Sequence, residues 1–91
     1  MEQLPKYQDL IAPLLQVLSA AAKPLSNAEI ERAIITKLNI PADLVSILHS
    51  GKRTELQYRL AWARTKSKTS GWITSPKRET WEVTPNGLRA D

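Results

Sequence analysis

Basic residues that could bind phosphate are concentrated in one stretch of this 91-residue chain. Between residues 52 and 79 only Glu55 and Glu79 oppose eight cations, so this stretch carries a net charge of +6. The eight cations are Lys52, Arg53, Arg59, Arg64, Lys66, Lys68, Lys77 and Arg78. The segments before and after the stretch each carry −1, so the whole excess of +4 originates in it. Such a concentration is typical of a surface that binds a polyanion, although a solvated basic face without a partner has the same composition.

Residues for catalysis or metal binding are scarce. The chain has no cysteine and a single histidine, His49, so disulfides and thiolate metal sites are excluded and a zinc site lacks its usual ligands. Glu29 and Glu31 are close in sequence but point to different faces of one predicted helix, and no glycine-rich phosphate loop is present. We therefore expect no cofactor, no metal site and no catalytic activity in this chain, with His49 on the surface.

The composition predicts one small domain in the cytoplasm. No apolar run approaches the roughly 20 residues that cross a membrane, and Met1–Pro5 has no signal-peptide pattern. A hydrophobic content of 42% over 91 residues is sufficient for a core. We expect a single domain over residues 1–91 that has no membrane contact and is a fragment of a longer protein.

Two capping patterns predict where helices begin. Ser26 with Glu29, and Thr54 with Gln57, have the spacing of a capping box, in which two side chains satisfy the first free N–H groups of a helix. The first box opens a helix with an apolar face, and the second opens the basic helix, which should end at Gly71.

An earlier apolar stripe predicts another helix within residues 7–18. Its start has two alternatives. If Asp9 is the cap, Pro13 falls in the first turn, where a missing N–H is tolerated; if the helix begins at Tyr7, Pro13 should kink it.

Shorter elements complete the prediction. Pro41 suits the first position of a short helix that continues through Leu48 and stops near Gly51. Residues 72–75 and 80–83 are rich in β-formers and predict a hairpin, and Thr84-Pro85 suits the start of a last helix.

These elements predict a mainly α fold with a small β-hairpin, a winged helix-turn-helix. In that fold the helix before the hairpin enters the DNA major groove, and the hairpin, or wing, reaches phosphates or the minor groove. We expect the apolar stripes of all elements to form one core from Leu10, Ile11, Leu14, Leu18, Ile30, Ile34, Leu38, Leu48, Leu56, Leu60, Ile73, Trp81 and Val83.

The basic helix has two predicted faces. Its core face carries two leucines together with Ala63, Ser67 and Ser70, and the opposite face is polar. A glutamine there can pair with adenine, threonine and alanine can contact a thymine methyl or a methylated base, and flanking cations can hold phosphates. The candidate DNA-binding residues are Lys52, Arg53, Thr54, Gln57, Tyr58, Ala61, Arg64, Thr65, Lys68, Lys77 and Arg78.

The positions of Trp62 and Tyr58 and the role of the wing-tip cations have alternative interpretations. A place in the core is favoured for Trp62, while core and groove are equally favoured for Tyr58. The wing-tip cations also have a second interpretation, because charges on a hairpin keep its edge from pairing with other molecules.

Several segments also carry a family resemblance, in the family's order along the chain. They are residues 5–7, 10–15, 50–51, 59–63, 68–71 and 78–87, which include the Arg59-Leu60-Ala61-Trp62-Ala63 run and the ending Trp81-Glu82-Val83-Thr84-Pro85-Asn86-Gly87. In them the chain resembles the N-terminal winged-helix domain of Mrr-type restriction endonucleases. The resemblance implies a DNA-binding module joined to a nuclease effector domain that attacks modified foreign DNA. The chain departs from the family at Glu79, where glycine is usual, and at Ser67 and Ser70, where leucine and alanine are usual.

The leading hypothesis is a module that binds double-stranded DNA and recognises modified, methylated DNA for a restriction or defence protein. The alternative is a winged helix that serves protein–protein interaction or dimerisation, so a homodimer is left open. Binding to duplex DNA that weakens with salt would distinguish the two hypotheses.

Overall fold

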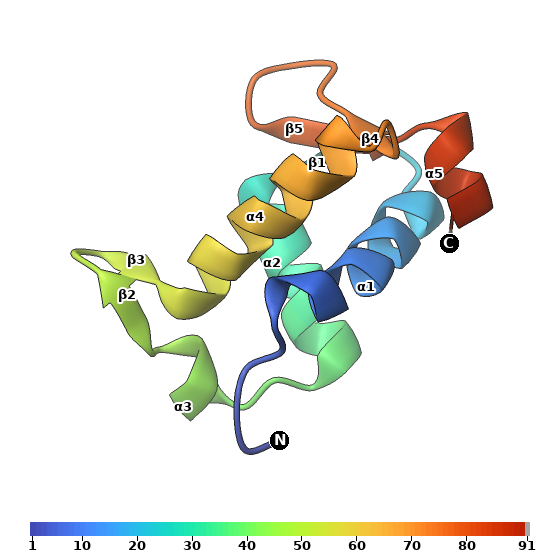
Figure 1. The fold of residues 1–91 in the computed structure, drawn as a ribbon. Coiled ribbons are helices and arrows are strands. Elements are labelled where there is room, and N and C mark those ends of the chain that lie inside the picture. The colour runs from blue at the N-terminus through green and yellow to red at the C-terminus, as the bar shows by residue number, and fades with distance from the viewer. Residues whose placement is uncertain (91) are drawn as a thin grey trace.

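Five helices and five short strands make up the fold in the computed structural model, which describes residues 1–90 (Figure 1). The helices are α1 (Tyr7–Ala20), α2 (Asn27–Leu38), α3 (Ala42–Val45), α4 (Glu55–Thr69) and α5 (Pro85–Ala90). The strands are β1 (Leu25–Ser26), β2 (Leu48–Ser50), β3 (Arg53–Thr54), β4 (Ile73–Thr74) and β5 (Thr80–Val83). The expected class, mainly α with small antiparallel strands, is confirmed at that level.

The core lies where α1 packs against α2 and α4. The best-buried side chains are Leu10, Leu14, Leu15, Ile30, Ile34, Leu56 and Leu60, most of them predicted core residues. The remaining buried apolar residues are Leu4, Leu18, Ile40, Leu44, Ala63 and Ile73. Four predicted core residues lie at its edge and are only partly buried: Ile11, Leu38, Trp81 and Val83. On α4 the buried Ser67 confirms the predicted core face, whereas Ser70 is exposed because it lies beyond the last turn.

Both predicted capping boxes are present. Ser26 Oγ accepts a hydrogen bond from the Glu29 N–H at 3.1 Å, and the Glu29 carboxylate accepts one from the Ser26 N–H at 2.9 Å. Thr54 and Gln57 form the same pair of bonds at 3.1 and 3.0 Å. At its other end α4 stops where Gly71 adopts φ +80°, a left-handed conformation that glycine accepts without strain. The two helices therefore begin, and α4 ends, where the sequence predicts.

Helix α1 begins at Tyr7, so Pro13 lies inside the helix and the alternative with Asp9 as the cap is wrong. Asp9 instead occupies the first turn. A proline inside a helix costs about 3 kcal/mol, because a hydrogen bond is lost and the ring meets the preceding turn. The four buried leucines of α1 offset that cost by placing the helix against the core.

The prediction for residues 41–51 is wrong in its second half. The short helix α3 ends at Val45, and the next residues form β2, which pairs with β3 around the turn at Gly51. Gly51 has φ +53°, so it makes a tight turn between two strands rather than ending a helix. The hairpin stands away from the core, which leaves Leu48 64% exposed and removes it from the predicted core.

The predicted hairpin of residues 72–83 is confirmed and gains a third strand. β5 pairs with β4, with Val83 opposite Ile73, and also with β1, so the strand order is β1-β5-β4. The indole N–H of Trp81 donates to Asn27 Oδ1 at 2.8 Å, which ties β5 to the start of α2. In the turn of this hairpin Glu79 has φ +59°, a conformation that strains residues with a side chain.

Helix α5 packs on the base of the same hairpin through Gly87. A Cβ atom at this position would lie 2.0 Å from the Trp72 carbonyl oxygen and 2.6 Å from Val83 Cγ2. The Thr84 hydroxyl donates to the Gly71 carbonyl at 2.6 Å and accepts from the Gly87 N–H at 3.1 Å. Glycine is therefore required here because two backbones approach closely.

Candidate nucleic-acid interface

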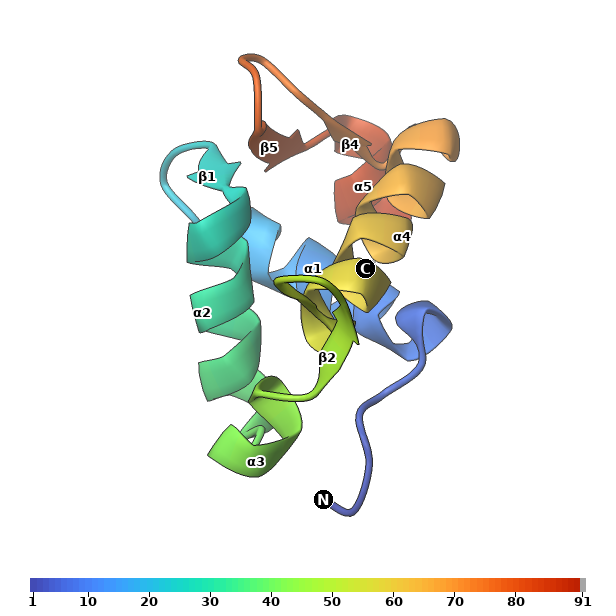
Figure 2. The ribbon, with the colours of Figure 1, turned by 90° about the vertical axis from the view of Figure 1, so that its left-hand side faces the viewer.

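Two hairpins flank α4, one at each end (Figures 1 and 2). The β2–β3 hairpin carries Lys52 and Arg53, and the turn between β4 and β5 carries Lys77 and Arg78. All four of these predicted site residues are exposed. The fold thus brings two pairs of cations, 24 or more residues apart in sequence, to the two ends of one helix.

The outer face of α4 carries a shallow hollow of about 250 Å³, lined by Arg53, Tyr58, Ala61, Trp62 and Thr65. Tyr58 is partly buried because it stacks on His49, with ring centroids 3.7 Å apart and planes inclined by 12°. The Arg53 guanidinium lies 5.6 Å from the centroid of the Tyr58 ring. Tyr58 therefore packs within the surface, between the two alternatives of core and open groove, and His49 is a surface residue as predicted.

Trp62 lies on this outer face, so its favoured place in the core is wrong. Its side chain is 48% exposed and contacts the edge of Tyr58, at 6.5 Å between centroids, and Tyr7 of α1, at 6.4 Å. The helix already fills the core with its leucine face, so a tryptophan on the adjacent face is covered on one side only. Its spacing of four residues from Tyr58 is the signal that could have placed both rings on one face.

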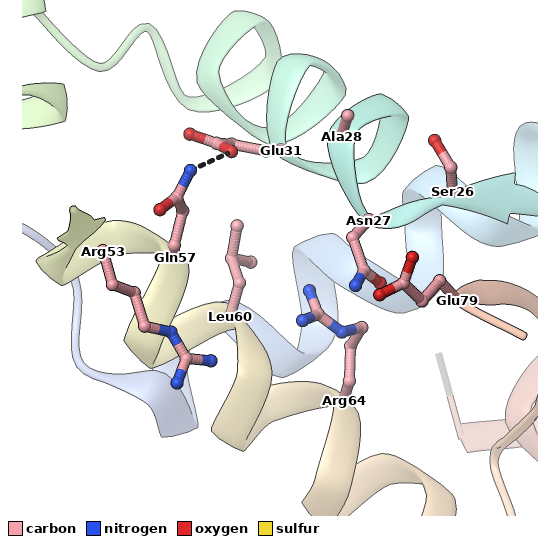
Figure 3. Close-up of a pocket in the computed structure, with 9 residues that line it drawn as sticks. All are labelled: Ser26, Asn27, Ala28, Glu31, Arg53, Gln57, Leu60, Arg64 and Glu79. Atoms are coloured by element: carbon pink, nitrogen blue, oxygen red, sulfur yellow. Dashed lines mark hydrogen bonds between the residues drawn. The ribbon is translucent and has the colours of Figure 1, made fainter.

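The neighbouring face of α4, between the outer face and the core face, borders a deeper cleft of about 440 Å³ (Figure 3). The cleft lies between α4 and the start of α2 and is bounded by both hairpins. Its lining residues are Ser26, Asn27, Ala28, Glu31, Arg53, Gln57, Leu60, Arg64 and Glu79. The sequence did not indicate that the first turn of α2, or Glu31 and Glu79, would share a cavity with the basic helix, because the pairing of β1 with β5 brings them together.

The side-chain amide of Gln57 is oriented by two neighbours. Its Oε1 accepts a hydrogen bond from the Thr54 N–H in the capping box, and its Nε2 donates to Glu31 Oε1 at 3.2 Å. Thr54 and Gln57 are therefore held in place by the helix start. A contact of Gln57 with adenine, which stays a prediction, requires that the bond to Glu31 be exchanged.

Arg64 is only 9% exposed, so it lies in the wall of the cleft rather than on the outer surface predicted for it. Its guanidinium is 5.9 Å from the ring of Trp81 and turns into the cleft below Asn27 (Figure 3). Burial, and then the positive charge of Arg53, lower the pKa of Arg64 below its ordinary value. The cation is thus held in a desolvated position by packing.

The other predicted contacts on α4 lie on or near the outer face. Thr65 is exposed and its hydroxyl donates to the Ala61 carbonyl at 2.9 Å. Lys68 is exposed, with Nζ 5.8 Å from the ring of Trp81. Each of these side chains can still reach a partner from solvent.

Residues 1–90 were also compared with the requirements for a metal site and for a membrane-spanning helix. In that range no group of three or more histidine, cysteine, aspartate or glutamate side chains is arranged to hold a metal ion. Over the same range, no helix combines the length and the apolar character needed to cross a membrane.

Comparison with known protein families supports the resemblance seen in the sequence. The family model of the Mrr N-terminal domain matches residues 7–91. This chain belongs to the Mrr N-terminal domain family. The comparisons with curated proteins and with solved structures gave no match.

In this Mrr N-terminal domain, residues from the segments that carry the family resemblance have structural roles. Arg59 donates to the carbonyls of Leu4 and Pro5, each at 3.0 Å, and to Glu55 at 2.8 Å, so it ties the N-terminal segment to α4. Hydrogen bonds from Arg59 and then from His49 lower the pKa of Glu55. The contacts of Arg59 and the close approach at Gly87 show that residues of these segments position α4 and the hairpins.

Proposed function

We propose that this Mrr N-terminal domain is a winged-helix module that binds double-stranded DNA through α4 and the two basic hairpins. The observation that carries the proposal is the position of the cations. Of the eight in the basic stretch, six are exposed: Lys52, Arg53, Lys66, Lys68, Lys77 and Arg78. A surface of this charge attracts the phosphates of a duplex and releases its counterions.

The winged-helix interpretation is supported by the order of the elements. Helix, strand, helix, short helix, the β2–β3 hairpin, helix and the β4–β5 hairpin follow one another, and β1 joins the last hairpin as its third strand. In such a module α4 would lie in the major groove, with the β4–β5 turn as the wing. Lys52 and Arg53 would then hold phosphates on one flank, and Lys77 and Arg78 on the other.

Base recognition would come from the outer face of α4. Ala61, Thr65 and the ring of Tyr58 offer apolar contacts that suit the methyl group of thymine or of a methylated base. We propose that the domain recognises modified DNA for a restriction protein of the cytoplasm. The cleavage would be the work of a separate effector domain, and this domain itself would not be catalytic.

The proposal is tested by titrating the domain with duplexes at two or more salt concentrations. Log affinity should fall linearly with log salt concentration, and each phosphate contact should make this slope more negative by about 0.9. Matched unmethylated and methylated duplexes test the preference, which Tyr58→Ala should change by about 1–3 kcal/mol if that ring contacts a base. A lower melting temperature for Tyr58→Ala, with the preference unchanged, would assign Tyr58 to packing alone.

A second function, dimerisation through the outer face of α4 and the neighbouring β2–β3 hairpin, is favoured by one observation. Trp62 is 48% exposed, and the β2–β3 hairpin and the residue before it expose Leu48 at 64% and Ile47 at 42%. Exposed apolar side chains of this size are common at protein interfaces. Sedimentation of the wild type and of Trp62→Ala over a range of concentrations tests this alternative, which predicts a dimer that the substitution dissociates.

A further inference from the structure

Arg64 is a largely buried cation that forms no salt bridge within residues 1–90. Its side chain is only 9% exposed, and among residues 1–90 it takes part in none of the side-chain hydrogen bonds or salt bridges. Its guanidinium lies 5.9 Å from the ring of Trp81, and the carboxylate of Glu31 in the same cleft favours its charge without forming a salt bridge. Its nitrogens are not among the fully buried polar atoms that lack a partner in residues 1–90, so they open onto the cleft. A guanidinium there offers five donors on a desolvated stem. The position is therefore suited to a ligand that brings negative charge.

The first turn of α2 adds donors on the facing wall. Within the described residues, the Asn27 N–H donates to the Glu79 carbonyl and the Glu29 N–H donates to Ser26, which leaves the Ala28 N–H without a partner. Asn27 Oδ1 accepts from Trp81, so the Nδ2 group of the same amide stays available to donate. Unpaired N–H groups at a helix start favour anions, and here they share a cleft with a buried arginine.

We propose that the cleft between α2 and α4 binds a phosphate group, with the Arg64 guanidinium as its main ligand and the Ala28 N–H and Asn27 amide as further donors. The inference deepens the proposed function and rests on it for the source of the phosphate, which is then the DNA backbone where it crosses the start of α2. A free phosphate has the same chemistry, so the test must separate the two sources.

Two carboxylates line the same cleft, and they set the strength of the site. Glu31 is engaged by Gln57 Nε2, whereas Glu79 makes no salt bridge among residues 1–90 and stands opposite Arg64 (Figure 3). A bound phosphate must therefore compete with the charge of Glu31, which acts on Arg64, and with that of Glu79. Glu31 also holds Gln57, so Glu79→Gln is the cleaner substitution, and removing that charge should strengthen phosphate binding several-fold. Glu82→Gln, on an exposed position of β5 outside the cleft, is the matched control.

The direct test follows the Arg64 Nε–H signal by NMR while the wild-type domain is titrated with inorganic phosphate and, separately, with a DNA duplex. We expect the signal to shift with the duplex and, at higher concentration, with phosphate. A shift with phosphate alone would support the site and refute DNA as its source. A duplex that binds, as seen from Lys77 and Arg78, while Arg64 stays unchanged would overturn the inference and leave the proposed function intact. No shift with either titrant would also overturn it.

Substitution separates a binding role from a structural one. Arg64→Met removes a largely buried charge that forms no salt bridge and keeps much of the volume, so we expect an unchanged or higher melting temperature together with about a tenfold loss of duplex affinity. Arg32→Met, at an exposed position of α2 that does not line the cleft, makes the same chemical change and should leave affinity within about twofold. A stable Arg64→Met protein with wild-type affinity would contradict the proposal.

Discussion

The two hairpins that flank α4 have similar tips and different foundations. Each tip carries two adjacent cations, Lys52 and Arg53 on β2–β3 and Lys77 and Arg78 between β4 and β5. The β4–β5 hairpin is built into the fold by the buried Ile73, by the bond from Trp81 to Asn27 and by its pairing with β1. The β2–β3 hairpin exposes Leu48 and contacts α4 through the stack of His49 on Tyr58 and the 3.0 Å contact of His49 Nδ1 with Glu55 Oε1. Two cations are thus carried by the β4–β5 hairpin, which is packed into the fold, and two by the β2–β3 hairpin, which lies at its periphery.

This difference has a consequence for binding. A cation on a well-packed hairpin loses little freedom when it contacts a phosphate, whereas a peripheral hairpin must be ordered when DNA binds. We therefore expect the β4–β5 tip to contribute more affinity per cation, and the β2–β3 hairpin to adjust its position on the duplex.

The largest expected effect concerns the foundation of the β4–β5 hairpin. Gly87→Ala would place a methyl group 2.0 Å from the Trp72 carbonyl oxygen, a backbone atom that cannot move without shifting the hairpin. We expect a loss of about 3 kcal/mol of unfolding free energy, measured by chemical denaturation. Leu88→Ala, on the next residue of α5 and exposed, should change stability by less than about 0.5 kcal/mol. Wild-type stability of Gly87→Ala would show that α5 does not support the hairpin.

The second prediction compares the two tips in DNA binding. Replacing Lys77 and Arg78 by Ala, or Lys52 and Arg53 by Ala, should each reduce the salt slope by about 2, because two phosphate contacts are lost. The first pair should cost more affinity than the second, and neither should alter which duplex is preferred. If the affinity loss of the second pair is equal or larger, the rigid hairpin has no advantage and the comparison fails.

A smaller effect is expected at the turn positions themselves. Both turns contain a left-handed residue, which is Gly51 in one and Glu79 in the other. Gly51→Ala should therefore lose, and Glu79→Gly should gain, about 1 kcal/mol of stability. Thermal unfolding of the two variants measures this, and the same sign of change in both would contradict the backbone explanation. Glu79→Gln, which keeps the side chain, should not share the gain.

The smallest expected effect is a change in how the melting temperature depends on pH in acid. Hydrogen bonds from Arg59 and His49 lower the pKa of Glu55, so its stabilising contribution is complete above the ordinary glutamate value of about 4.3. It is lost as the pH falls through the lower value in the folded protein. Glu55→Gln should flatten the decline of melting temperature below about pH 4.5, whereas Glu82→Gln should leave it unchanged. An equally steep decline in Glu55→Gln would show that the bonds around Glu55 contribute nothing.

Local signals in the sequence predicted much of this fold. The capping boxes at Ser26 and Thr54, the end of α4 at Gly71 and the β-formers around Trp81 depend on neighbouring residues, and each was found where expected. The β2–β3 hairpin was missed because Ile47-Leu48 follows α3 without a break in its apolar pattern. A glycine at position 51 fits a helix end as well as a turn.

The site depended on contacts that no local pattern contains. Arg64 lies at the edge of the basic face on a helical projection, and its burial results from the approach of α2 and β5. Trp62 was placed in the core on its size, although the leucines of α4 had already filled the core face. Which side chains are exposed on α4 is therefore set by the packing of distant elements.

The central claim is that α4 and its two hairpins bind duplex DNA. The most direct measurement is a titration of the wild-type domain with a DNA duplex at low and at moderate salt. With both tips engaged, at least four phosphates are contacted, so the slope of log affinity against log salt should be about −3.6 or steeper. Absence of binding at low salt, or an affinity that does not change with salt, would contradict the claim.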